Sequence, residues 1–447
     1  MKKTLLLSAF LAVSGVMNAQ WTAQTTTVPE PSRGVKDITI FDANNVWAIS
    51  RDGSGSSAPV ANAIRTTNGG NTWVSTPIDL GDPTLSVNNL VALNMTTAWV
   101  SAIDGSSTTG PWPGGIWKTT DAGLNWTQQN PSAYTNAAAF INVVHFFDAN
   151  VGISQGDPSI SATDFEMYRT TDGGETWTAI PNSSLPNSAS GEAGYNGGNV
   201  GVGNSFWFVT NKGKIYRTQD RGITWTKLNT VSGLSDFAGT NIGGEIKFST
   251  ESIGCLLKRT GTFTTGTFSL FTTTDGGTTW STTGTPTIYS SVSYIPGTTT
   301  LIGTGSAGSG YSNDHGATWT ELDSGIQRDD STFLNATTGW AGGFSADAST
   351  PGGIYKYTGP ALSINTVANN QTKIVAYPNP ANNILNLKGA SISKVVAFDI
   401  LGKQVLNQDF SAQTEVAINV SSLKTGMYVL QVTNDLGATE TIKFAKK

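Results

Sequence analysis

Six copies of one eight-residue phrase constrain this chain more than any other feature. The phrase reads Ser/Thr-x-Asp-x-Gly-x-x-Trp, and successive Trp residues are 39 to 55 positions apart. The copies occupy residues 66–73, 119–126, 170–177, 218–225, 273–280 and 312–319. A repeat of this period, with several short strands in each unit, is typical of a β-propeller.

Each copy is predicted to form a hairpin turn between two strands. The glycine at the fifth position supplies a conformation that other residues adopt only at a cost. The third position can accept hydrogen bonds from amides of its own turn, and it is occupied by Asn68, Asp121, Asp172, Asp220, Asp275 and Asp314. The tryptophans open the next strand and are expected between neighbouring blades; they are Trp73, Trp126, Trp177, Trp225, Trp280 and Trp319. Because the motif occurs six times, we interpret it as structural and not as one unique site.

These six turns resemble the Asp-box, or BNR, repeats of sialidases, sortilin-type receptors and photosystem II assembly-factor-like propellers. In those families the box staples the fold on the face opposite the binding site. The resemblance implies the same arrangement here, with ligands bound on the other face.

Strand patterns between the boxes predict seven blades. Openings rich in Val and Ile begin near residues 36, 87, 140, 197, 241, 289 and 330. The seventh blade lacks a box and a fourth strand. The segment that starts at Trp21 matches the strands that follow the boxes, so residues 21–27 are predicted to complete the last blade and close the ring. The expected fold class is all-β, a seven-bladed propeller over residues 20–360 followed by a small β-sandwich.

The N-terminus has the pattern of a secretory signal peptide. Two lysines precede an apolar run, and residues 1–19 end in Ala19. No other apolar run is long enough to span a membrane. Cys255 is the single cysteine, so no internal disulfide and no lipoprotein attachment at the leader are expected.

The composition changes near residue 374. Residues 361–374 read as a linker, and residues 375–447 alternate apolar and polar side chains as a compact β-sandwich does. This segment resembles the type A C-terminal sorting domain of the type IX secretion system of Bacteroidetes. The matching residues are Tyr377, Pro378, Asn379, Pro380, Gly402, Gly426 and Tyr428. The resemblance implies the type IX machinery as a partner, and either release or attachment at the outer cell surface after export to the periplasm.

The charge distribution argues against nucleic acid as a partner. Residues 20–371 hold 16 Lys and Arg against 26 Asp and Glu, a net charge of −10. Phosphate binding needs clustered cations, which this segment lacks. No metal-binding His/Cys cluster or cofactor motif is present, so no cofactor and no metal are expected.

Binding is the favoured function, and the ligand is expected at the long loops opposite the boxes. Trp112, Arg51 and Arg259 are the candidate ligand-binding residues. A glycan and a surface protein are both open as ligands, and the chain is expected to be a monomer.

Catalysis is the alternative. A polysaccharide-directed glycoside hydrolase needs only two suitably spaced carboxylates. The candidates in predicted loops of the binding face are Asp52, Asp104, Asp157, Asp164 and Glu192. A sialidase activity is disfavoured, because the chain has only eight arginines and several of these precede or lie within boxes.

Overall fold

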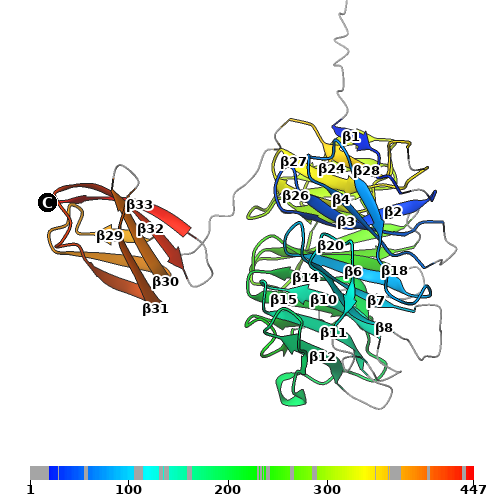
Figure 1. Ribbon diagram of the computed structural model, residues 1–447, viewed down its shortest axis with the longest axis horizontal. Helices are drawn as coiled ribbons and strands as arrows, with labels where there is room; N and C mark the ends of the chain where they lie inside the picture. Colours follow the sequence, from blue (N-terminus) through cyan, green and yellow to red (C-terminus); the bar gives the residue numbers. More distant parts are fainter. Residues whose placement is uncertain are drawn as a thin grey trace, which may run out of the picture. The chain divides into compact units, whose positions relative to one another are not determined.

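The chain forms two compact units, residues 1–366 and 367–447 (Figure 1). The computed structural model describes residues 20–28, 30–54, 59–104, 114–129, 134, 140–158, 164–228, 231, 234, 236–237, 242–261, 266–283, 289–347, 349–360, 362, 374–399, 403–434 and 439–447. The predicted signal peptide, Trp112, Gly402 and most of the predicted linker lie outside these residues. No helix among the described residues is long and apolar enough to cross a membrane.

The first unit is a ring of seven four-stranded antiparallel sheets, as the repeats predict. Each of the first three blades runs from an inner to an outer strand in chain order. Blade 1 contains β2 (Arg33–Ile40), β3 (Val46–Asp52), β4 (Asn62–Thr66) and β5 (Val74–Pro77). Blade 2 contains β6 (Ser86–Ala92), β7 (Ala98–Ile103), β8 (Gly114–Thr119) and β9 (Thr127–Gln128). Blade 3 contains β10 (Ile141–Phe146), β11 (Gly152–Pro158), β12 (Phe165–Thr170) and β13 (Thr178–Ala179).

The next three blades follow the same order after one 3-10 turn, η1 (Asn182–Ser184). Blade 4 contains β14 (Gly194–Val202), β15 (Ser205–Thr210), β16 (Ile215–Thr218) and β17 (Thr226–Lys227). Blade 5 contains β18 (Ile242–Phe248), β19 (Gly254–Thr260), β20 (Thr267–Thr273) and β21 (Ser281–Thr283). Blade 6 contains β22 (Ser291–Tyr294), β23 (Leu301–Gly305), β24 (Gly308–Ser312) and β25 (Thr320–Ser324).

The seventh blade joins the two ends of the propeller. It contains β26 (Ser331–Asn335), β27 (Thr338–Gly342) and β28 (Ile354–Tyr357), and its outer strand is β1 (Trp21–Gln24). Trp21 pairs with Tyr357 and Gln24 with Ile354. The predicted closure by the N-terminal strand is therefore confirmed. Pairing of β1 with β28 completes the four-stranded sheet of blade 7 and joins the N-terminal end of the propeller to its C-terminal end.

Trp21 anchors the closing strand in the core. Its side chain is 3% exposed and packs edge-on against Phe333 and Tyr357. Its indole N–H donates to Ser309 Oγ over 2.9 Å. The guanidinium of Arg328 lies 5.1 Å from the indole ring. The closure thus ties the N-terminal strand to blades 6 and 7 by side chains as well as by backbone.

Each eight-residue repeat forms the turn between the third and fourth strands of its blade. In the second copy, Asp121 Oδ1 accepts hydrogen bonds from the amides of Leu124 and Asn125 at 3.1 and 3.0 Å. Thr119 Oγ1 accepts the amide of Gly123 at 2.9 Å. In the first copy the amide oxygen of Asn68 accepts the equivalent bond from Thr72. The local hydrogen bonding that the sequence predicts is therefore present.

The repeat turns also hold neighbouring blades together. A cation on the third strand of one blade reaches a carbonyl in the repeat turn of the next blade around the ring. Lys356 Nζ donates to Gly69 O at 2.8 Å, and Arg217 donates to Gly276 O at 3.0 Å. Lys356 also lies over the indole of Trp340, 5.3 Å from its centre. These contacts fix the angle between blades.

Two faces of the ring follow from this topology. The repeat-turn face carries the repeat turns and the connections between first and second strands. The loop face is the opposite end, where the inner strands begin and the second strands end. The register shows this in blade 1, where Arg33 at the start of β2 pairs with Asp52 at the end of β3.

The C-terminal unit is a small, nearly closed β-sheet domain. Its strands are β29 (Val375–Tyr377), β30 (Ile384–Asp399), β31 (Gln404–Asn419), β32 (Gly426–Asn434) and β33 (Thr439–Lys446). The long strand β30 pairs with β29 and β32 on one edge and with β31 on the other. A bridge from Ala381 to Lys446 draws the ends together. The small β-sandwich expected from the sequence is thus formed by one continuous sheet that curls around a hydrophobic core.

The sorting-motif residues shape this small domain. Asn379 donates to Lys443 O and accepts the Ala445 amide at 3.0 and 2.9 Å, so it ties the segment after β29 to β33. Tyr428 is 8% exposed and stacks on Phe444. The motif therefore lies within the scaffold of the domain.

Candidate functional site

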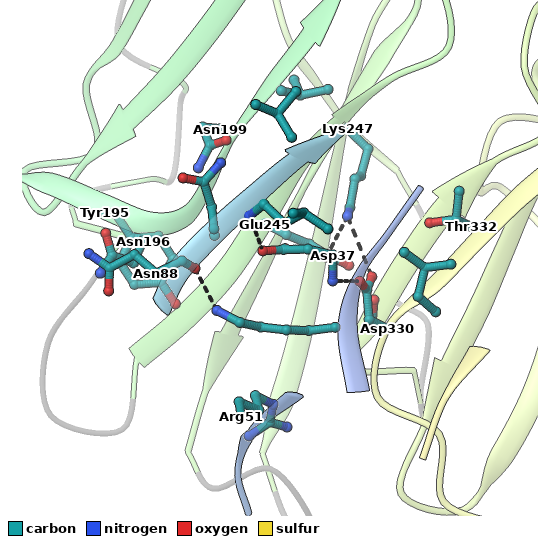
Figure 2. A pocket seen from close by; sticks show the side chains of 18 of the residues that line it. Asp37, Arg51, Asn88, Tyr195, Asn196, Asn199, Glu245, Lys247, Asp330 and Thr332 are labelled. Carbon is teal, nitrogen blue, oxygen red and sulfur yellow. Dashed lines mark hydrogen bonds and ion pairs between the residues drawn. The ribbon is translucent and has the colours of Figure 1, made fainter. Parts of the chain in front are cut away.

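A polar pocket of about 820 Å³ lies along the inner strands of all seven blades and reaches the loop face at Arg51 and Arg259. A volume of this size is within the range of small-ligand sites. Figure 2 shows side chains converging on it from β2, β6, β14, β18 and the segment before β26. We call it the channel pocket.

One ammonium lies between two carboxylates in this pocket (Figure 2). Lys247 Nζ is 3.3 Å from Glu245 Oε2 and 3.7 Å from Asp330 Oδ1. The three side chains are 28%, 14% and 20% exposed, respectively. Glu245 and Lys247 are two residues apart on β18, so their side chains lie on the same side of the strand and both line the channel pocket, whereas Asp330 directly precedes the first strand of blade 7. The ion pair of Lys247 with Asp330 therefore links blades 5 and 7, which are not neighbours in the ring.

The same carboxylates connect the inner strands of adjacent blades. The inner strand is one edge of each blade's sheet, so its backbone amides that face away from the sheet need hydrogen-bond acceptors outside the sheet. Asp330 Oδ2 accepts the Asp37 amide at 3.1 Å, and Asp37 Oδ2 accepts the Leu90 amide at 3.1 Å. Glu245 Oε1 accepts the Val292 amide. Three junctions between blades thus depend on one oxygen from each carboxylate.

Uncharged side chains perform this task elsewhere in the ring. Asn89 donates to Val144 O at 2.8 Å and accepts the Val144 amide at 3.0 Å, which joins blades 2 and 3. Tyr195 OH accepts the Gly244 amide at 3.3 Å, which joins blades 4 and 5. An amide or a hydroxyl is therefore sufficient for a junction.

Burial acts against the charges of the pocket. It raises the pKa of Asp37 although Lys36 opposes the shift, and it raises the pKa of Glu245 although Lys247 opposes it. Burial also lowers the pKa of His145 to about 4, so its imidazole is neutral at pH 7. The carboxylates are thus held in surroundings that solvate them poorly.

Asp37 also has an unusual backbone. Its φ is +51°, and the register between β2 and β3 shifts at this point. A non-glycine residue in the left-handed region costs about 1 kcal/mol or more and tends to occur at functional sites. The bulge turns the carboxylate of Asp37 toward the channel pocket.

Both arginines predicted to bind ligand line the channel pocket. Arg51, at the end of β3, forms an ion pair with Asp329 and lies 5.2 Å from the centre of the Phe344 ring. Arg259 occupies the equivalent end of β19, near the hydroxyl of Tyr195. Trp112 lies outside the described residues.

None of the five acids proposed for hydrolysis lines the channel pocket. Asp52 pairs with Arg33 at 3.0 Å. Glu192 has a 0% exposed side chain and is bound by Lys227 at 3.2 Å and by Thr210 at 2.9 Å. The structure therefore places both in the scaffold.

The other three acids lie on the loop face at blades 2 and 3. Asp104 follows β7. Asp164 precedes β12, and its Oδ1 is buried without a hydrogen bond to any described residue. Asp157 accepts Asn142 Nδ2 and the Gly194 amide, both at 2.7 Å, and burial raises its pKa to about 6. The structure does not bring the five acids together in one site.

The channel carboxylates were missed because they lie in inner strands or directly before one, and not in long loops. A signal was nevertheless present. Three of the predicted inner strands place charges near their start, in VKDITI, GEIKF and DDSTF, where burial toward the ring axis predicts apolar side chains. Among the described residues no group of three or more His, Cys, Asp or Glu is arranged to hold a metal ion.

Comparison with known proteins agrees with both parts of this architecture. Residues 375–447 match the family of the secretion system C-terminal sorting domain, and residues 113–254 match the family of photosynthesis system II assembly factor YCF48. No curated protein matches the chain.

Solved structures show a likeness in fold. YCF48 from Cyanidioschyzon merolae is 16% identical, with a TM-score of 0.50 over 76% of this chain and 99% of that chain. A YCF48 bound to a D1 peptide is 15% identical, with a TM-score of 0.49 over 76% and 97%. A GH74 enzyme of Niastella koreensis is 14% identical, with a TM-score of 0.45 over 91% and 71%. The sorting domain indicates export to the cell surface or secretion through the machinery that reads it. The protein is thus an exported seven-bladed β-propeller, partly matched by the YCF48 family, that carries a secretion system C-terminal sorting domain.

Proposed function

We propose that this protein is a secreted or cell-surface binding module that takes a glycan or a surface protein at its channel pocket. The observation that carries the proposal is a pocket of about 820 Å³ on the loop face, lined by charged and amide side chains. Long loops on a rigid ring are suited to recognition. The monomeric state expected from the sequence is part of the proposal.

The ion pairs favour binding over hydrolysis. A glycosidase needs space between its two carboxylates for the scissile bond or for a water molecule. Here Lys247 lies between Glu245 and Asp330 and forms an ion pair with each of them. This pair therefore has the arrangement of a recognition site.

A polysaccharide-directed glycoside hydrolase is the second candidate. The supporting observation is Asp157, whose pKa is raised to about 6 at the loop face. A carboxyl group with such a pKa can act as a general acid near neutral pH.

One experiment separates the two candidates. The purified chain is incubated with a panel of plant, algal and host polysaccharides, and both reducing-sugar release and retention on insoluble glycans are measured. Retention without release is expected. Release that is lost in Asp157→Asn would establish hydrolysis. If the chain neither releases sugar nor is retained on glycans, the proposal predicts that the immobilised chain captures a surface protein. Failure to capture one would then refute the binding function.

A further inference from the structure

The negative charges of the channel pocket exceed what the fold requires. Each junction between inner strands needs one hydrogen-bond acceptor, and Asn89 shows that a neutral amide supplies it. Asp37, Glu245 and Asp330 perform the same task as charged groups in a poorly solvating site. Lys247 pairs with Glu245 and Asp330, and such ion pairs supply the pocket with charged donors and acceptors that the junctions themselves do not use.

The second oxygen of two of these carboxylates points away from the junctions. Glu245 Oε2 and Asp330 Oδ1 face Lys247 and the pocket, whereas Glu245 Oε1 and Asp330 Oδ2 accept backbone amides. The pocket thus presents acceptors on both sides of one strong donor.

Ser291 adds a buried hydroxyl to the same wall. It is 5% exposed and lines the channel pocket at the start of β22. Its Oγ is near enough to Glu245 to lower the pKa of that carboxyl, yet it makes no hydrogen bond of ordinary geometry with the described residues. The hydroxyl beside Glu245 thus adds a group that can donate and accept to the polar lining of the pocket.

The charges that line the pocket balance. The cations are Lys36, Arg51, Lys247 and Arg259, and the carboxylates are Asp37, Glu245, Asp329 and Asp330. Five amide side chains complete the polar lining: Asn88, Asn89, Asn142, Asn196 and Asn199. Such a lining offers donors and acceptors in close alternation, without a net field for an anion or a cation.

We propose that the channel pocket binds a neutral carbohydrate, with adjacent hydroxyl groups of one sugar residue donating to Glu245 and Asp330 and accepting from Lys247. The proposal rests on the binding function above and names its ligand class. Sugar hydroxyls both donate and accept, which matches an ammonium placed between two carboxylates. A uronic acid would face the carboxylates, and an amino sugar would face Lys247 and the arginines.

The test uses the full chain and titration calorimetry, with saturation-transfer NMR for weak ligands. The probes are the methyl glycosides of glucose, galactose, mannose and N-acetylglucosamine, together with neutral cello-, xylo- and manno-oligosaccharides. Glucuronic acid, glucosamine and short acidic and basic peptides are the charged comparators. The variants Glu245→Gln and Asp330→Asn keep the acceptor at each junction and remove the charge.

A matched control is available on the opposite face. Glu251 accepts the Asn204 amide at 2.8 Å between blades 4 and 5, and it lies away from the channel pocket. Glu251→Gln therefore removes a charge at a junction without changing the proposed site. Thermal unfolding of each variant verifies that the ring is intact.

At least one neutral sugar is expected to bind, with affinity tenfold or more weaker in Glu245→Gln and Asp330→Asn and unchanged in Glu251→Gln. Equal binding to all variants would overturn the inference. Binding of only a charged sugar or a peptide, with the same sensitivity to the two variants, would overturn the ligand class and leave the binding function intact. No binding of any sugar would also overturn the inference, and the protein-capture experiment above would then decide the binding function separately.

Discussion

Removal of the Trp21 side chain should destabilise the whole propeller, because this side chain anchors the strand that closes the ring. Trp21 is 3% exposed, touches two aromatic rings and donates to Ser309 Oγ. Truncation of a buried tryptophan to alanine costs about 3–5 kcal/mol. Unfolding entropy is about 2.1 cal/mol/K per residue, or roughly 0.7 kcal/mol/K for a propeller of about 340 residues. Trp21→Ala should therefore lower Tm by roughly 4–7 °C.

The measurement is differential scanning calorimetry of the full chain, with Thr22→Ala as the matched control. Thr22 lies on the same strand, is exposed, and hydrogen-bonds through its side chain to the Thr358 hydroxyl at 3.0 Å. Its substitution should change stability by about 0.5 kcal/mol or less. If both variants melt within 1 °C of the original chain, β1 does not close the ring in solution and the reasoning fails.

Three further changes test the packing and the charges of the propeller. In urea unfolding, Gly316→Ala should lower the free energy of unfolding by about 1–3 kcal/mol more than Gly325→Ala. Both glycines have a positive φ, but only at Gly316 would the new Cβ lie 2.3 Å from a leucine of the preceding blade. Equal losses of stability in the two variants would contradict this reasoning. Burial raises the pKa of Asp157 to about 6, so the stability it contributes is full below its unfolded pKa near 4 and is lost as pH rises through 6. Asp157→Asn should remove up to about 3 kcal/mol of this pH dependence of the free energy of unfolding. An unchanged pH profile of stability in the variant would refute the raised pKa. Arg328→Met should cost about 3–5 kcal/mol in chemical unfolding, because it leaves Asp323 without the 2.9 and 2.6 Å bonds from a fully buried guanidinium; adding Asp323→Asn should recover part of the loss, and a loss below 1 kcal/mol would count against the pair.

The repeat turns and the ring closure were predictable because their determinants are local. The Asp or Asn and the Thr or Ser of the repeats accept hydrogen bonds from amides two to four residues away, so the motif and its conformation coincide. The closure is a contact between distant parts of the chain, yet it was predictable from the likeness of residues 21–24 to strands that follow the repeats. The sorting domain was recognised for the same reason, as a local motif with fixed spacing.

The candidate site was predicted only in part. Arg51 and Arg259 lie at the ends of second strands, and their position follows from the topology alone. The candidate carboxylates of the long loops do not line the channel pocket. Glu192 instead forms a buried ion pair with Lys227, and Asp52 pairs with Arg33.

The sequence by itself determined the class of fold, the number of blades, the face that carries the repeat turns and the presence of a sorting domain. These properties depend on periodicity and on hydrogen bonds within a few residues. Only the tertiary structure decided that Glu245 and Lys247 of blade 5 meet Asp330 of blade 7 and lie near Asp37 of blade 1. The physical reason is that the closed ring brings inner strands far apart in sequence around one pocket. No local sequence pattern determines which of their side chains meet across the axis.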